Sequence, residues 1–166
     1  CEKALPYIEK VYQRNPSKFM FLRYLECSRQ LTGDKAVIKL LKNQIKSFPQ
    51  EYEYQVTLGT EYENQGDQKN ADKTFLSIID NMLPYSSDII KIQKAFSALG
   101  KSELALQALE RGRKIIQGNY PLNIQFAEVY GELGRIEEMI DEYLGLIDYQ
   151  SNMVTTVQRM MPRMVE

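Results

Sequence analysis

Glycine recurs at a nearly constant spacing along this chain, at Gly33, Gly66, Gly100 and Gly134, and no other feature restricts the fold as strongly. The intervals between these glycines are 33, 34 and 34 residues. A period of this size is typical of proteins built from stacked repeats. Because one such unit is too short to bury its own apolar face, neighbouring units must pack against one another. The spacing therefore predicts a repeat array.

Each of these glycines separates two segments with the apolar periodicity of a helix. A glycine can end a helix at positive φ, where other residues lose about 1 kcal/mol or more. After Gly66, Asp67 can then cap the next helix. We call the helices before and after the glycine the A helix and the B helix of a unit. The third unit shows the pattern on both sides of its glycine: Ile89, Ile92, Phe96 and Leu99, then Ala105, Leu109, Gly112 and Ile116.

The second repeat of the chain, which contains Gly66, resembles the tetratricopeptide repeat (TPR), a helix–turn–helix motif of about 34 residues. The third and fourth repeats fit the TPR pattern less completely, and the first repeat fits it only if Gly33 is moved by one residue. The resemblance implies an all-α fold, a right-handed superhelical solenoid of antiparallel helix pairs. The residues of the second repeat that carry the resemblance are Leu58, Gly59, Tyr62, Gly66, Ala71 and Phe75.

We expect a single TPR-like repeat domain over residues 1–166 with incomplete units at both ends. Natural arrays usually end in polar capping elements, so the incomplete ends indicate a fragment of a longer protein. The exposed end helices also offer a surface for a symmetric homodimer. The expected segments are the B helix of a preceding repeat at 1–16, repeats at 17–51, 52–85, 86–119 and 120–151, and a C-terminal helix at 152–166 that Pro162 would stop.

The charge and composition of the chain argue against several functional classes. Lys plus Arg is 21 and Asp plus Glu is 22, whereas nucleic-acid binders normally carry a basic excess. The chain contains no His, the commonest general base and a common metal ligand. No apolar run approaches the roughly 18 residues of a membrane helix. We therefore expect no catalysis, cofactor, metal, nucleic acid or membrane insertion, in a soluble protein of the cytoplasm or the periplasm.

The two cysteines are too few for a disulfide framework. Cys27 lies within a helical pattern, so we expect it to pack as a small apolar residue. Cys1 has an alternative interpretation as the lipidated first residue of a mature lipoprotein, although it lies inside the repeat pattern.

Three local motifs favour structural interpretations. Gly100-Lys101-Ser102 matches the end of a phosphate-binding P-loop, but Ala95 replaces the first glycine and a helix precedes the motif, so an inter-helix turn is expected. The basic run at 111–114 is expected to face solvent or to pair with Glu110. The methionine-rich tail is expected to pack on the fourth B helix, with adaptable partner binding as the alternative; its methionines are Met153, Met160, Met161 and Met164.

In the TPR family the A helices line a concave groove, and we transfer that role position by position. Acids outnumber bases among these residues, so a partner with some basic character is favoured. The matched Lys and Asn residues that clamp a terminal carboxylate in one branch of the family are missing here. The groove candidates are Glu26, Arg29 and Gln30, then Glu53, Thr60, Glu63 and Asn64, then Lys94 and Ser97, and finally Glu128 and Glu132.

The resemblance implies a protein–protein interaction scaffold that binds a peptide or helix of a partner in this groove, with no catalysis of its own. A helical solenoid offers a long surface rather than a preformed catalytic pocket. The alternative is a structural spacer or assembly segment of a larger multi-domain protein. Mutation of the groove separates the two, because a spacer should tolerate it.

Overall fold

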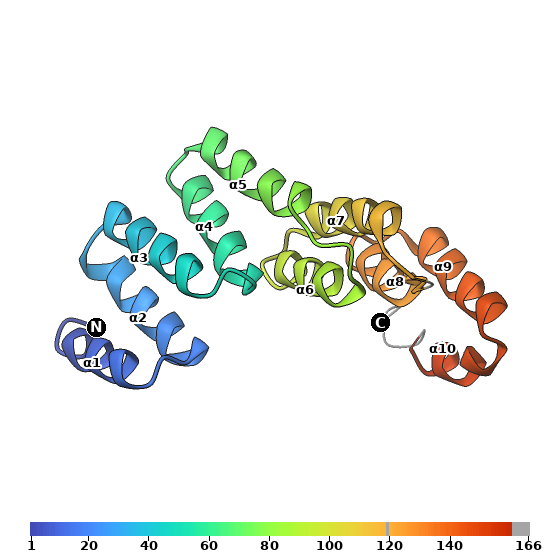
Figure 1. The fold of residues 1–166 in the computed structure, drawn as a ribbon, viewed down its shortest axis with the longest axis horizontal. Coiled ribbons are helices and arrows are strands. Elements are labelled where there is room, and N and C mark those ends of the chain that lie inside the picture. The colour runs from blue at the N-terminus through green and yellow to red at the C-terminus, as the bar shows by residue number, and fades with distance from the viewer. Residues whose placement is uncertain (119, 161–166) are drawn as a thin grey trace. The chain divides into compact units, whose positions relative to one another are not determined.

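A computed structural model describes residues 1–118 and 120–160 (Figure 1), and within these residues there are helices and turns but no strand. This confirms the all-α prediction for the described part of the chain. None of its helices is both long and apolar enough to cross a membrane. The elements are α1 (Leu5–Arg14), α2 (Lys18–Leu31), α3 (Asp34–Ser47), α4 (Tyr52–Asn64), α5 (Gln68–Asp80), α6 (Ser86–Ser97), α7 (Ser102–Ile115), α8 (Asn123–Glu132), α9 (Ile136–Tyr149), the 3-10 turn η1 (Ser151–Met153) and α10 (Val154–Met160).

The helices form two compact units, Cys1–Thr74 and Phe75–Glu166, and the boundary between them falls within α5. In the first unit α2 packs against α1 and α3, and α3 packs against α4. In the second unit the two most extensive contacts join α6 to α7 and α8 to α9. Each of these two pairs is an A helix followed by its B helix, as the sequence predicts. The superhelical arrangement of the whole array stays a prediction.

The turn at Gly66 has the geometry that the sequence predicts. Gly66 adopts a φ of 75°, in the left-handed region that glycine tolerates best. Its N–H donates to the carbonyl of Glu63 and the N–H of Asp67 donates to that of Tyr62, each at 2.9 Å, which together make a Schellman motif. Asp67 then caps α5, because its Oδ1 accepts the N–H of Asn70 at 3.2 Å. The turns at Gly100 and Gly134 repeat the same pair of backbone bonds.

The first helix pair departs from this pattern. Its turn consists of Thr32 and Gly33 alone, whereas the turn from α4 to α5 also contains a capping residue after the glycine. Gly33 is itself the residue that precedes α3, and it too has a positive φ. The shorter turn explains why the first repeat, at 17–51, matches the TPR pattern only when its glycine is moved by one position.

Apolar side chains from consecutive helices form a core in each unit. In the first unit this core joins α2, α3 and α4. In the second, a cluster joins α8, α9 and α10, and Met153 and Met160 pack against it while partly buried. These two methionines therefore pack against a cluster to which the fourth B helix, α9, contributes Met139, Tyr143 and Leu146, as the prediction for the tail requires. Met161, Met164 and Pro162 lie outside the described residues. The first core contains Phe21, Leu25, Val37, Leu41, Tyr54 and Leu58.

A glycine within α7 allows the close approach of α6 and α7. A Cβ at Gly112 would lie 2.5 Å from Cγ2 of Ile89, a fully buried side chain. We therefore expect Gly112→Ala to lower the free energy of unfolding by about 1–2 kcal/mol, because overpacking outweighs the gain in helix propensity. Urea unfolding measures the change. In an Ile89→Ala background the same substitution should cost much less, and an equal cost in both backgrounds would contradict the steric explanation.

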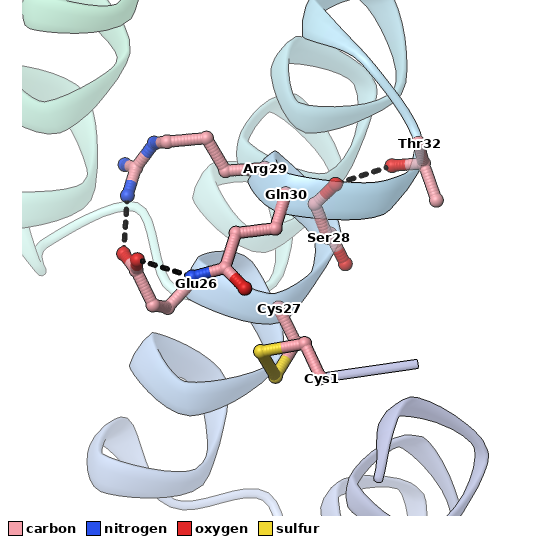
Figure 2. Close-up of a disulfide and its surroundings, with 7 residues drawn as sticks. All are labelled: Cys1, Glu26, Cys27, Ser28, Arg29, Gln30 and Thr32. Atoms are coloured by element: carbon pink, nitrogen blue, oxygen red, sulfur yellow. Dashed lines mark hydrogen bonds and ion pairs between the residues drawn. A yellow bond between two sulfur atoms is a disulfide. The ribbon is translucent and has the colours of Figure 1, made fainter. Parts of the chain in front are cut away.

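A disulfide joins Cys1 to Cys27 of α2, with the two Cα atoms 5.0 Å apart (Figure 2). Cys27 is buried, with 7% of its surface exposed, as expected for an apolar position. The interpretation of Cys27 as a simple apolar thiol is nevertheless wrong, because helical periodicity reports burial and not which distant residue lies alongside. The lipoprotein interpretation of Cys1 also fails to fit this structure, since the same sulfur cannot hold a thioether-linked lipid.

Candidate functional site

The groove residues predicted in the third and fourth repeats lie together on two neighbouring A helices of the Phe75–Glu166 unit. Lys94 on α6 and the pair Glu128 and Glu132 on α8 line one cleft of about 320 Å³. Figure 1 shows these two helices within the second unit, and they contact each other directly. The sequence also predicted Ser97, which completes the polar wall of this cleft. The remaining lining residues are Gln93 and Gly131.

The amphipathic character of α6 and α8 turns these residues away from the apolar core. On α6, Ile92 and Phe96 are fully buried while Lys94 is exposed. On α8, Ala127 and Val129 are fully buried while Glu128 between them is half-buried. Residues four apart on a helix share a face, so Glu128 and Glu132 point to the same side. The helical period therefore places both acidic residues on the face of α8 that lines the cleft.

A chain of hydrogen bonds crosses the cleft from Gln93 to Glu132. The Nε2 of Gln93 donates to Oγ of Ser97 at 3.1 Å, and this hydroxyl donates to Oε2 of Glu132 at 2.9 Å. The hydroxyl of Ser102 donates to the same carboxylate oxygen at 2.7 Å. A carboxylate can only accept, so the Ser97 hydroxyl must use its hydrogen there and accept from Gln93. This order fixes the nitrogen end of the Gln93 amide toward Ser97.

The oxygen end of the Gln93 amide is left without a donor. Gln93 is only 2% exposed, and its Oε1 has no hydrogen-bond partner among the described residues. A buried acceptor without a donor costs about 1–3 kcal/mol, so such an atom calls for an explanation. Gln93 was not among the groove candidates. Its only signal in the sequence is a polar residue beside Ile92 in a strongly apolar stretch of an A helix.

The half-buried carboxyl of Glu128 lies in an environment that disfavours its ionised form. Burial raises the pKa of its carboxyl above the ordinary value, the positive charge of Lys94 works in the opposite direction, and Glu132 raises it further. Burial also raises the pKa of the Tyr143 hydroxyl, with a smaller contribution from Glu128. No hydrogen bond joins Glu128 to another side chain in the described part of the chain. Its charge is thus desolvated without a direct partner, as is common at binding sites.

We expect Glu128→Gln to stabilise the chain at neutral pH. A carboxyl whose pKa is raised on folding opposes folding when ionised, so this penalty is present above the folded pKa and absent below the unfolded pKa. The gain in unfolding free energy should stay below about 1 kcal/mol, because the half-exposed group is screened by solvent. Thermal unfolding of both proteins between pH 4 and pH 7 tests this. A variant less stable than the wild type at pH 7 would show that Lys94 outweighs the burial.

The groove candidates of the first unit are largely engaged with each other. The guanidinium of Arg29 donates to Glu26 on the same helix and to the buried Glu61 on α4, with Nε 3.1 Å from Oε1 of Glu61. The contact with Glu26, which also accepts from Gln30, is visible in Figure 2. The hydrogen bond to Glu61 raises the pKa of Arg29 above its ordinary value. Glu61 was not predicted.

Two further candidates on α4, Glu53 and Thr60, also have local contacts. Glu53 pairs with Lys18 of α2, a residue that the sequence did not single out. The hydroxyl of Thr60 donates to the carbonyl of Val56 on its own helix at 3.1 Å. Asn64 is exposed at the end of α4. The pairs formed by Arg29 and Glu53 tie α2 to α4, so this face of the first unit is cross-linked rather than open.

The other sequence motifs have structural roles. Gly100 has a φ of 68° and lies in the turn between α6 and α7, as expected for Gly100-Lys101-Ser102. In the basic run, Arg113 pairs with Glu142 of α9 rather than with Glu110. Within the residues that the structure describes, no group of three or more His, Cys, Asp or Glu side chains could hold a metal ion.

Comparison with known proteins finds solved structures of low similarity. No protein-family model and no curated protein sequence match the chain. A solved structure of MamA is 18% identical over 76% of this chain and 74% of its own, with a TM-score of 0.39. A thermophilic TPR protein of Thermus thermophilus is 15% identical over 99% of this chain and 90% of its own, with a TM-score of 0.43. Both TM-scores are low, so the TPR-like description follows from the helices and turns above.

Proposed function

We propose that this chain is a protein-interaction module that binds a peptide or helix of a partner protein along its A helices. The observation that supports this most directly is the α6–α8 cleft. Lys94, Glu128 and Glu132, which the sequence assigned to a groove, all line it. Its two acids and one base favour a partner segment of basic character. Extended peptides and helices are the usual ligands of such surfaces.

Reversing the charge of the cleft should remove partner binding. Peptides are selected from a random display library against the wild-type chain, and their affinity is measured for Glu128→Lys combined with Glu132→Lys. We expect a loss on the order of tenfold or more, because attraction becomes repulsion. The matched control is Asp141→Lys with Asp148→Lys, which makes the same charge change at exposed positions of α9. Equal losses in both variants, or none in either, would contradict the assignment to the cleft.

A spacer function is the second candidate, and the first unit favours it. Arg29 bridges α2 to Glu61 of α4, and Lys18 bridges α2 to Glu53 of α4. Such pairs stiffen the contact between successive A helices and occupy the groups that a peptide would need. If the library yields no specific peptide for the wild-type chain, the spacer function is favoured. The symmetric dimer through the end helices stays a prediction, and a monomer in light scattering at high concentration would contradict it.

We also propose that the chain works in an oxidising compartment, such as the bacterial periplasm or the cell exterior. The disulfide between Cys1 and Cys27 supports this, since such bonds persist outside the reducing cytosol. Trapping the thiols by alkylation directly in lysed source cells tests it. Recovery of the chain with both cysteines alkylated would contradict an oxidising location.

A further inference from the structure

The α6–α8 cleft combines a charge and an unfilled acceptor that together specify a ligand group. Glu128 supplies a half-buried carboxylate on α8. Gln93, which is almost wholly buried on α6, supplies an amide oxygen without a donor. Both residues line the same cleft. The second feature lies on the other helix, and the Ser97 hydroxyl, which donates to Glu132, sets the orientation of the amide. Each of the two groups lacks a hydrogen-bond donor among the described side chains, and one positively charged group with several donors could serve both.

We propose that this cleft binds the guanidinium of an arginine side chain in the partner segment, with the Glu128 carboxylate as its counter-ion and Oε1 of Gln93, which is covered in the free chain and is uncovered as the ligand enters, as its second acceptor. The proposal rests on the proposed protein-interaction function and specifies its ligand chemistry. A guanidinium carries five N–H donors in a planar fork, so it can donate to a carboxylate and to an amide oxygen at once. The cleft of about 320 Å³ has room for the side chain.

Glu132 has a supporting role in this arrangement. Its Oε2 already accepts hydrogen bonds from the hydroxyls of Ser97 and Ser102. It therefore contributes negative charge to the cleft while holding Ser97, and through it the Gln93 amide, in place. Glu128 has no such bonds in the described structure and is the carboxylate available to a ligand.

Lys94 competes with the proposed ligand. Its ammonium lies near enough to Glu128 to oppose the effect of burial on that carboxyl. Because Lys94 is exposed, it can move into solvent when another cation enters. An arginine would replace a solvated, mobile charge by one that also satisfies Gln93. The arrangement therefore predicts opposite effects for two neighbouring charges: removing Glu128 weakens binding, and removing Lys94 strengthens it.

The test adds N-acetyl-arginine methylamide as a probe to the full chain. Binding is measured from the NMR chemical shifts of the Gln93 side-chain amide and of the backbone amides at 93–97 and 128–132. We expect saturable shifts with a Kd on the order of 1–10 mM, as befits a small ligand. The citrulline analogue, which has the same shape without the charge, should not saturate. The lysine analogue should bind more weakly than the arginine probe, because an ammonium cannot span both acceptors in one plane.

Variants assign the binding to the named groups. Glu128→Gln and Gln93→Leu should each weaken the probe by about tenfold, and Lys94→Gln should tighten it by about threefold. Asp141→Asn on α9 is the matched control and should have no effect. Should Gln93→Leu fail to fold, Glu128→Gln alone decides, since it retains shape and removes only charge. Absence of saturable shifts at these residues, equal binding of citrulline, equal binding of lysine, or an unchanged affinity in Glu128→Gln would each overturn the proposal.

The two proposals can fail separately. If the library yields cleft-dependent peptides but the arginine probe does not bind, the guanidinium site is wrong and the interaction function stands. If the probe binds as expected but no peptide depends on the cleft, the chemistry of the site stands and the interaction function is wrong.

Discussion

Reducing the Cys1–Cys27 disulfide is expected to lower the free energy of unfolding of the first unit by about 3 kcal/mol. The bond closes a loop with a sequence separation of 26 residues, and the entropy of such a loop sets this magnitude. The native contacts of α1 cannot replace it, because no residue of that helix is buried. Its remaining contacts include Tyr12, whose ring centre lies 5.6 Å from that of Phe21 and whose hydroxyl bonds to Gln44, and Glu9, which accepts from the Tyr24 hydroxyl.

Hydrogen exchange and urea unfolding, each with and without reductant, measure this effect. Amides of α1 should lose protection on reduction, while α6 to α9 in the second unit should keep theirs. Cys1→Ser should reproduce the effect of the reductant, and adding reductant to this variant should change nothing further. An unfolding free energy that is equal in the oxidised and reduced states to within about 0.5 kcal/mol would show that α1 docks without the disulfide.

The fold could be predicted because its signals are local. A glycine such as Gly66 is required by the conformation of a single turn, and the apolar period of α6 is set by burial of one side of a single helix. Both can be read without knowing what lies elsewhere in the chain. The disulfide could not, since the proximity of Cys1 to Cys27 depends on how α1 lies against α2. The shorter turn at Gly33 was visible only as a poor match to the repeat.

The candidate site was predicted in part for the same reason. The helical period places Lys94 and Glu128 on the side of α6 and α8 opposite the core, so their shared cleft follows from the repeat. The role of Gln93 could not be predicted, because its missing donor appears only when every neighbouring hydrogen bond is assigned. In the first unit the repeat pattern placed Arg29 correctly on an A helix but gave no sign of its partner Glu61.

Arg113 shows most clearly how a surface charge can hold helices together. Its two terminal nitrogens donate to the two carboxylate oxygens of Glu142, each at 2.8 Å, and its guanidinium lies 3.7 Å from the centre of the Phe126 ring. Asn123 of α8 donates to the same carboxylate at 2.7 Å. These contacts join α7, α8 and α9. We expect Arg113→Ala to lower the free energy of unfolding of the second unit by about 2–3 kcal/mol, through the lost bidentate pair and the lost stacking.

This magnitude reflects partial exposure. The Arg113 side chain is 42% exposed and that of Glu142 is 13% exposed, so the loss should fall short of the cost of breaking a fully buried pair. Arg113→Lys should recover little, because an ammonium can neither fork across the carboxylate nor stack flat on Phe126. The matched control is Arg111→Ala, which removes the same charge from an exposed position of α7 and should change stability by less than about 0.5 kcal/mol. Urea unfolding that gives equal losses for the two alanine variants would mean that Arg113 acts only as a solvated charge, as its position in a basic run first indicated.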